Sequence, residues 1–302
     1  MSCKVLAIVG PTASGKSSLA IQAAKLLNGE VVNGDSVQVY RGLDIGSAKI
    51  TEKEMDGVVH HLLNVRDIPE GYSVKDFQDD ARKSIKDISD RGRLPVICGG
   101  TGLYIKALLY DYSFAEGITE GEDYEDVSSE ELYERLRELD PVSAEKIHPN
   151  NRKRVIRALN MAKSGQIKSA QEARQKHEPV YDVFICGLTM PRDMLRERID
   201  RRVELMFEDG LLEEVTELDR KYDWSLQALQ GIGYKEFKEY FSGESTLEEV
   251  KEKIKTHTRQ FAKRQYTWWN HQLPVRWYDV SEEGAIDRAL EDMKEWLNGQ
   301  TV

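Results

Sequence analysis

Close to its start the chain reads Lys4-Val-Leu-Ala-Ile-Val-Gly-Pro-Thr-Ala-Ser-Gly-Lys-Ser17, a short apolar run followed by a glycine-rich segment. The run predicts a buried strand over residues 4–9, and the helical spacing of the apolar residues after it predicts a helix that begins at Ser17. Residues 10–17 fit the pattern Gly-x-x-x-x-Gly-Lys-Ser/Thr in the strand–loop–helix context that such a match requires. We therefore expect the chain to open with a phosphate-binding loop.

This loop has the chemistry of an anion site. Its glycines let backbone N–H groups turn toward a phosphate, and the following helix adds the positive end of its dipole. Lys16 supplies a mobile charge, and the hydroxyl of Ser17 can ligate Mg²⁺. A glycine-rich turn without any ligand is the weaker interpretation, and the loop alone does not identify the phosphate compound.

Strand-like and helix-like segments alternate along the first part of the chain. Residues 31–32 and 94–98 are apolar and strand-like, and residues 72–90 carry apolar side chains at helical spacing, with Ser73 as a candidate N-cap. Residues 183–188 resume the strand pattern after a long interruption. This alternation predicts an α/β fold with a parallel sheet core flanked by helices and a site at the carboxyl ends of the strands.

The interruption is helical in pattern and strongly polarised in charge. Residues 114–145 hold twelve acidic and two basic residues, whereas residues 146–176 hold nine basic and one acidic. We therefore expect a core domain made of residues 1–111 and 183–302, with an all-helical insertion domain at residues 112–182.

Helices dominate the remainder of the core. They are expected over residues 192–209 and 211–221 and from Leu247 onward, where Ser245 and Glu248 have the spacing of a capping box. Four basic residues at steps of four on the last helix are expected to face solvent or phosphate: Lys251, Lys255, Arg259 and Lys263.

Two polar side chains follow strands beside the loop. The strand at residues 94–98 runs into Gly-Gly-Thr-Gly without a carboxylate, which argues against ordinary ATP or GTP hydrolysis. Asp35 follows the second strand and Thr101 the third, so both are expected to face the crevice next to a bound phosphate. A carboxylate there suits a general base for a nucleophile that must lose a proton, and a turn-forming Asp35 is the alternative.

Six blocks in order resemble the motifs of the bacterial tRNA dimethylallyltransferases. Two of them are nearly diagnostic together, Asp35-Ser-Val-Gln-Val-Tyr-Arg-Gly-Leu-Asp-Ile-Gly-Ser-Ala-Lys49 and Thr258-Arg-Gln-Phe-Ala-Lys-Arg-Gln-Tyr-Thr-Trp268. The others are residues 10–17, 99–104, 154–159 and 233–236. The resemblance implies transfer of a dimethylallyl group from dimethylallyl diphosphate to N6 of the adenosine at position 37 of certain tRNAs.

The resemblance also implies a role for particular residues. Asp35 would be the base for the adenine N6, with Thr101 beside it, and Arg202 would grip the diphosphate. The implied cofactor is Mg²⁺, held at Ser17. The implied diphosphate-binding residues are Gly10, Thr12, Ala13, Ser14, Gly15, Lys16, Ser17 and Arg202.

The implied partner is the anticodon stem-loop of tRNA, whose adenosine must leave its stack to reach the crevice. Ser47, Asn160 and Gln230 depart from the usual family residues, which leaves the fine tRNA contacts open. Matching positions implied to contact tRNA are Asp35, Ser36, Val37, Gln38, Thr101, Lys153, Arg154, Arg157, Gln230, Gly231, Ile232, Gly233, Tyr234 and Lys235.

The composition fits this interpretation once the charge is followed along the chain. The 302 residues have a formal net charge of −10, which taken as an average argues against a nucleic-acid partner. The average hides residues 146–176, with nine basic residues against one acidic, and residues 251–277, with seven against one. The three cysteines are far apart and lack metal-ligand spacing, so we expect them to be reduced and structural.

No secretory leader or membrane span is readable, so we expect a cytoplasmic protein with no membrane partner. One chain suffices to enclose an RNA arm, so a monomer without an obligate protein partner is expected. Three other functions stay open: prenylation of free AMP or ATP, which has less need of a basic insertion, a small-metabolite kinase, and a non-catalytic nucleotide sensor.

Overall fold

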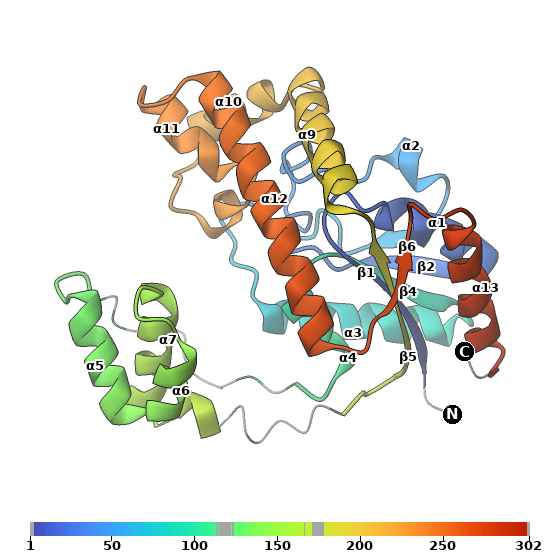
Figure 1. Ribbon diagram of the computed structural model, residues 1–302, viewed down its shortest axis with the longest axis horizontal. Coiled ribbons are helices and arrows are strands. Elements are labelled where there is room, and N and C mark those ends of the chain that lie inside the picture. The colour runs from blue at the N-terminus through green and yellow to red at the C-terminus, as the bar shows by residue number, and fades with distance from the viewer. Residues whose placement is uncertain are drawn as a thin grey trace. The chain divides into compact units, whose positions relative to one another are not determined.

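The computed structural model describes residues 3–112, 114, 122, 124–165, 167–170 and 178–300 (Figure 1). It contains two compact units, one made of Met1–Leu109 and Pro179–Val302 and the other of Tyr110–Glu178. The insertion is expected at residues 112–182. The second unit begins two residues earlier, at Tyr110, and ends four residues earlier, at Glu178. The difference at the C-terminal boundary has a structural reason. The Val180 N–H donates to the carbonyl of Leu109 at 2.9 Å, so the segment before β5 is already attached to the first unit.

A six-stranded, entirely parallel sheet forms the centre of the first unit, with the order β3-β2-β4-β1-β5-β6. The parallel α/β core expected from the sequence is thereby confirmed. The sequence pattern does not indicate β3 or β6, because neither contains a continuous apolar run. The strands are β1 (Lys4–Val9), β2 (Gly29–Asn33), β3 (His60–His61), β4 (Leu94–Cys98), β5 (Asp182–Thr189) and β6 (Arg276–Asp279).

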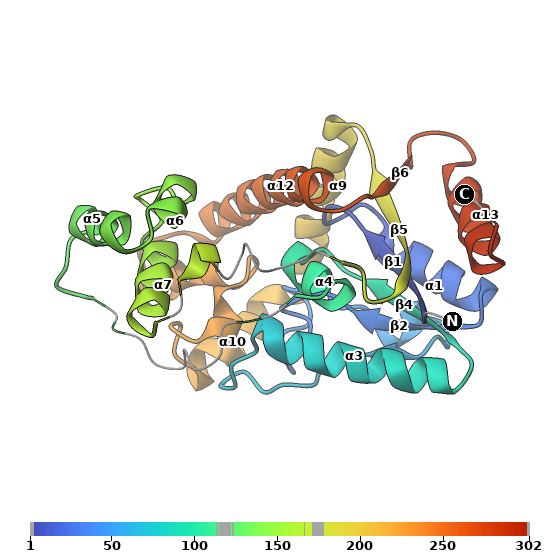
Figure 2. The same cartoon turned by 90° about the horizontal axis from the view of Figure 1, so that it is seen from below.

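Helices cover both faces of the sheet. Figure 2 shows α3 and α4 on one face and α1 and α13 on the other. Leu19, Ala23 and Met293 of the latter pair are buried in one apolar cluster with residues of β1 and β4. The helices of the unit are α1 (Lys16–Leu26), α2 (Glu52–Met55), α3 (Val74–Asp90), α4 (Gly102–Leu109), α9 (Arg192–Glu208), α10 (Leu211–Lys221), α11 (Lys238–Phe241), α12 (Leu247–Gln272) and α13 (Ala285–Leu297), with 3₁₀ turns η1 (Gln227–Gln230) and η2 (Lys235–Phe237).

Side-chain caps set the starts of α3 and α12. Ser73 caps α3 in a capping box with Asp76, as the sequence indicates. The box predicted at the start of α12 is wrong by one residue, because the cap is Thr246 and its partner is Glu249. Thr246 has extended backbone angles and its side chain accepts from the Glu249 N–H, so the helix begins at Leu247 as expected.

The second unit is helical where it is described. Its described residues include the helices α5 (Ser129–Leu139), α6 (Pro141–Lys146) and α7 (Arg152–Lys163). They bury a core of their own in which Leu132, Leu136 and Ala158 are fully inaccessible to solvent. Across the described part of the chain, no helix combines the length and apolarity needed to cross a membrane.

Candidate active site

The phosphate-binding loop joins β1 to α1. Gly15 has φ 96°, and α1 begins after it with neither a side-chain cap bond nor an acidic residue in its first turn. The helix N-terminus is therefore left to an external anion. The Lys16 ammonium donates to the carbonyl of Pro11 at 2.6 Å, so the lysine folds back over its own loop. Burial lowers the pKa of Lys16 to about 8, and the positive charge of Arg202 acts in the same direction.

A pocket of about 320 Å³ lies over this loop, lined by Lys16, Ser17, Arg198 and Arg202 among others. Within the described residues, no three His, Cys, Asp or Glu side chains gather into a metal site. The exposed hydroxyl of Ser17 thus offers one oxygen and no all-protein cage. That arrangement fits Mg²⁺, which commonly takes one or two protein oxygens and fills its remaining positions with phosphate oxygens and water.

Asp35 lies in a tight turn just past β2. Its Oδ1 accepts from the Val37 N–H at 2.8 Å and from the Gln38 N–H at 3.3 Å. The turn-forming role weighed from the sequence is thus present, but it occupies only one carboxylate oxygen. In the part of the chain that the structure describes, no hydrogen bond reaches Oδ2. That second oxygen remains for a ligand.

The turns after β2 and β4 touch each other, which brings Thr101 to Asp35. A Cβ at Gly99 would lie 2.3 Å from the backbone of Gly34, so this approach requires glycine. Next to this contact, the N–H of Ser36 in the first turn donates to Oγ1 of Thr101 in the second at 3.2 Å. The sequence-based expectation that both strand ends face one crevice is confirmed.

The crevice is a pocket of about 330 Å³ that gathers residues from distant parts of the chain. Of the residues in the first unit that are implied to contact tRNA, two do not line it: Gln38, whose amide donates to the carbonyls of Ser47 and Ala48, and Tyr234, which is fully buried. Those that do line it are Asp35, Ser36, Val37, Thr101, Gln230, Gly231, Ile232, Gly233 and Lys235, together with Thr12 and Arg202.

Arg202 on α9 connects the two pockets, because it lines both. Its Nη1 donates to Thr12 Oγ1 at 3.3 Å and its Nη2 to the carbonyl of Ala48 at 3.4 Å. Burial lowers the pKa of the guanidinium, and the negative charge of Asp35 opposes that effect. An anion on the phosphate loop would therefore meet a poorly solvated positive charge at the entrance to the Asp35 pocket.

Glu214 on α10 organises one wall of the pocket, although the sequence does not single it out. Its carboxylate accepts from the N–H groups of Asp44, Ile45 and Gly46 at 3.1, 2.7 and 3.1 Å. It also accepts from the Tyr234 hydroxyl at 2.8 Å. This one side chain ties the loop after β2 to the loop before η2, a contact that no local pattern could reveal.

A second group missed from the sequence is the apolar wall contributed by α9 and α12. Val203 and Ile254 are buried and line the pocket together with Met206 and Phe261. The helical spacing of such residues is typical of core packing, so spacing alone gives no sign that they border a cavity.

The basic ridge expected on α12 is mostly neutralised, which corrects the expectation that it faces solvent or phosphate. Lys251 and Lys255 both pair with Glu204 of α9, at 3.0 and 2.6 Å. Arg259 Nε donates to Asp200 of the same helix at 2.7 Å. Steps of four therefore place these residues toward a neighbouring helix whose acidic side chains the pattern on α12 cannot show.

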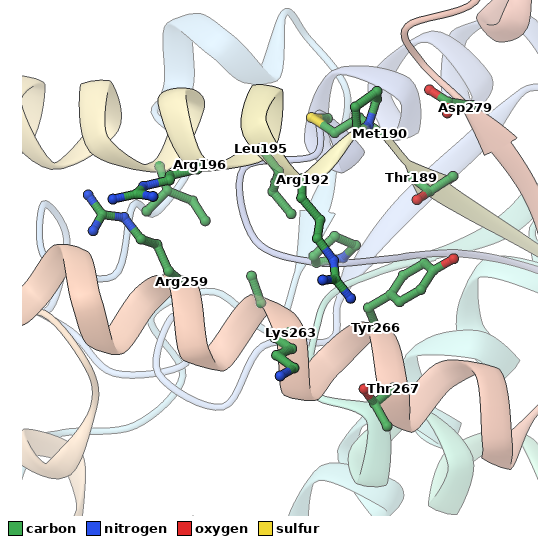
Figure 3. A pocket seen from close by; sticks show the side chains of 14 residues that line it. Thr189, Met190, Arg192, Leu195, Arg196, Arg259, Lys263, Tyr266, Thr267 and Asp279 are labelled. Atoms are coloured by element: carbon green, nitrogen blue, oxygen red, sulfur yellow. The ribbon is translucent and has the colours of Figure 1, made fainter.

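A larger pocket of about 580 Å³ lies between α9 and α12, and Pro11 of the phosphate loop forms part of its wall. Figure 3 shows Arg192 extending from the start of α9 toward α12, where Lys263 and Tyr266 lie. Among the described residues, those that line this larger pocket include neither Asp35 nor any residue implied to bind diphosphate or tRNA. The smaller pocket around Asp35 is therefore the candidate active site.

The basic residues expected to bind tRNA in the second unit lie on α7. Lys153, Arg154 and Arg157 are exposed, and none of the three forms an ion pair within the described part of the chain. They are thus available to bind phosphate groups, unlike the paired cations of α12.

Comparison with known proteins gives a consistent result. A family model described as "IPP transferase" matches residues 38–272. A protein from Anoxybacillus flavithermus named tRNA dimethylallyltransferase is 46% identical over 304 residues, which cover 99% of this chain and 98% of that protein. One of the same name from Bacillus mycoides is 47% identical over 287 residues, 92% of this chain and 90% of that protein.

Solved structures extend the similarity to three dimensions. The full-length tRNA isopentenylpyrophosphate transferase from Bacillus halodurans superposes with a TM-score of 0.75 at 42% identity, over 98% of this chain and 96% of that one. A eukaryotic dimethylallyltransferase, described as acting on tRNA, superposes with a TM-score of 0.88 at 31% identity. That match covers 100% of this chain and 81% of the other.

Proposed function

Because the chain belongs to the tRNA dimethylallyltransferase family, we propose that it transfers the dimethylallyl group of dimethylallyl diphosphate to N6 of adenosine 37 in tRNA. Diphosphate is the second product. The enzyme class, a prenyltransferase of tRNA modification, comes with the family.

The observation that carries the proposal is the position of Arg202 between two pockets. A diphosphate seated on the phosphate loop would have Lys16 on one side and Arg202 on the other. Its carbon end would then point into the pocket that holds Asp35. A leaving group and a proton acceptor on opposite sides of one carbon are what group transfer to an amine requires.

The reaction exchanges one bond at C1 and moves one proton. The adenine N6 attacks C1 of the dimethylallyl group, the C1–O bond breaks, and its electron pair leaves with diphosphate. The proton released from N6 passes to Oδ2 of Asp35, the carboxylate oxygen that carries no backbone hydrogen bond. Because the N6 lone pair is conjugated with the ring, such a base contributes about 10²–10⁴ in rate.

Charge that builds on the departing diphosphate is stabilised by fixed groups. Lys16, Arg202 and the free N–H groups at the start of α1 surround the place where it develops. Bound Mg²⁺, with Ser17 as its protein ligand, would supply further neutralisation of the diphosphate oxygens. Thr101 holds the Asp35 turn through its bond from the Ser36 N–H and so orients the base.

The apolar wall of the pocket suits the five-carbon tail. Val203, Met206 and Phe261 would pack against the dimethylallyl group and exclude water from the carbon that becomes electron-poor. Exclusion of water matters because a water molecule would compete with N6 and hydrolyse the donor.

The second unit is proposed to hold the anticodon stem-loop. Lys153, Arg154 and Arg157 are three exposed cations of α7 that form no ion pair with any residue the structure describes. Contacts of this kind bind the phosphate backbone with little regard to sequence. Readout of the flipped adenosine would fall to the loop at Gly231 and Gly233 in the pocket.

One assay tests the proposal. Unmodified tRNA is incubated with radiolabelled dimethylallyl diphosphate, Mg²⁺ and the full chain, and label is expected in tRNA at adenosine 37. A tRNA with guanosine at that position is the matched control and should remain unlabelled. Label on AMP but not on tRNA would favour prenylation of free nucleotides, ATP consumption with a phosphorylated acceptor would favour a kinase, and nucleotide binding without product would favour a sensor.

A further inference from the structure

Gln265, on α12, is a buried polar side chain with both ends in use. It is 6% exposed. Its Oε1 accepts from the Thr12 N–H at 2.9 Å, and its Nε2 donates to the carbonyl of Gly100 at 3.0 Å. A Cβ at Gly100 would lie 2.2 Å from Nε2, so the glycine makes room for this amide.

One end of Gln265 anchors the phosphate loop. Thr12 is the loop residue whose hydroxyl accepts from Arg202, and its backbone N–H is directed at Gln265. The position of the loop relative to α12 therefore depends on this hydrogen bond. Because the loop would hold the diphosphate of the donor, the bond acts on the leaving-group side of the site.

The other end anchors the turn after β4, which carries Thr101. Gly100 directly precedes Thr101, whose Oγ1 accepts from the Ser36 N–H beside Asp35. Gln265 thus contacts the backbone of the phosphate loop and of the turn after β4. The turn after β4 also meets the Asp35 turn through Thr101 and Ser36.

We propose that Gln265 is a positioning residue that sets the spacing between the donor diphosphate and the base Asp35. This inference rests on the proposed function. Gln265 touches neither reactant in this scheme and acts through Thr12 and Gly100. Its side chain suits the task because an amide offers one acceptor and one donor from the same planar group, which a carboxylate or an ammonium does not.

The chemistry of the amide suggests two informative variants. Gln265→Met keeps the length and removes both hydrogen bonds. Gln265→Glu keeps the acceptor for the Thr12 N–H, but when ionised it places an oxygen against the Gly100 carbonyl with no proton between them. When protonated, the same carboxyl can donate to that carbonyl and restore both bonds. The matched control is Asn270→Met, an exposed amide on the same helix.

Steady-state transfer to tRNA and calorimetric binding of inorganic pyrophosphate with Mg²⁺ are measured for each variant. Since displacements of about 1 Å can cost about 10²-fold in rate, Gln265→Met is expected to lower kcat by about 10–100-fold. The KM for tRNA should stay within about twofold, because the tRNA surface is untouched. Pyrophosphate affinity should fall a few-fold, and the control should match the wild type.

The pH dependence distinguishes positioning from simple core packing. The ratio of kcat for Gln265→Glu to kcat for the wild type is expected to rise as the pH falls from 8 to 6, as the new carboxyl becomes protonated. If Gln265→Met does not fold, the pH dependence of this kcat ratio alone tests the proposal. A flat ratio, or a folded Gln265→Met with kcat and pyrophosphate affinity near those of the wild type, would overturn the proposal. If the wild type does not prenylate tRNA, the proposed function is refuted. The pyrophosphate affinities of the wild type and Gln265→Met would then still test whether Gln265 positions the phosphate loop.

Discussion

The variants Asp35→Asn and Asp35→Ala distinguish the structural role of Asp35 from its proposed catalytic role. Its Oδ1 holds a turn by accepting from the N–H groups of Val37 and Gln38, at 2.8 and 3.3 Å. Its Oδ2 is the proposed proton acceptor. Asp35→Asn keeps an oxygen for the turn and abolishes the base, whereas Asp35→Ala removes both.

The expected magnitudes differ accordingly. Without a general base, kcat should fall by about 10²–10⁴ in both variants. A hydrogen bond to a charged group is worth about 1.5–3 kcal/mol and a typical one about 0.5–1.5 kcal/mol. Asp35 is half-buried and one of its two bonds is long, so Asp35→Ala should lower the free energy of unfolding by about 1–3 kcal/mol. Asp35→Asn should lose much less stability, since the amide oxygen replaces the carboxylate oxygen in the turn.

The measurements are single-turnover transfer at saturating tRNA and donor, and urea unfolding followed by circular dichroism. Asp223→Asn is the matched control, because the Asp223 carboxylate accepts from the Ser225 N–H at 2.7 Å in an exposed turn outside the pocket. If Asp35→Asn retains a rate within about fivefold of the wild type, the base assignment is wrong, because a lost base should cost about 10² or more. If alanine and asparagine unfold at the same urea concentration, the turn contributes nothing measurable.

Three further outcomes are expected. Burial lowers the pKa of Lys16 to about 8, so the affinity for pyrophosphate should be full below about pH 8 and should fall as the pH rises through that value. Calorimetry measures the affinity, and Lys16→Met, which should lack this fall, corrects for titration of pyrophosphate itself. Glu214→Gln weakens a carboxylate that accepts from three backbone N–H groups and from Tyr234, so it should cost about 1.5–3 kcal/mol of unfolding free energy in urea, and an unchanged midpoint would contradict its role. Arg154→Ala with Arg157→Ala should make the slope of log affinity for tRNA against log salt shallower by about 1.4–1.8, whereas an unaltered slope would move the RNA surface elsewhere.

Local patterns suffice for much of the fold. Strands β1, β4 and β5 each contain a continuous apolar run, and their buried positions follow from that composition. The cap of α3 at Ser73 is likewise legible, because a capping box involves residues only three apart. Strand β6 is different: its four residues include two charged ones, and it becomes a strand only because the edge of β5 is there to pair with it.

The basic ridge of α12 shows the same limit for charge. Lys255 looks like a solvent-facing cation in the sequence, yet its ammonium lies 2.6 Å from Glu204 of α9. Charge on one helix face cannot be interpreted until the opposing surface is known, since an ion pair removes the cation from any other partner. On α7, where Arg154 and Arg157 remain unpaired in the described residues, the sequence-based interpretation still stands as a proposal.

The sequence by itself determined the phosphate loop, the parallel core and the placement of Asp35 and Thr101 in one crevice, because each depends on short-range spacing or on the rule that parallel strands end at one edge. Only the tertiary structure decided what surrounds them. Gln265 and Glu214 reach the site from helices more than a hundred residues away in the chain, through hydrogen bonds to backbone groups. Backbone N–H and carbonyl groups look alike at every residue, so only the folded chain reveals which of them a distant side chain will meet.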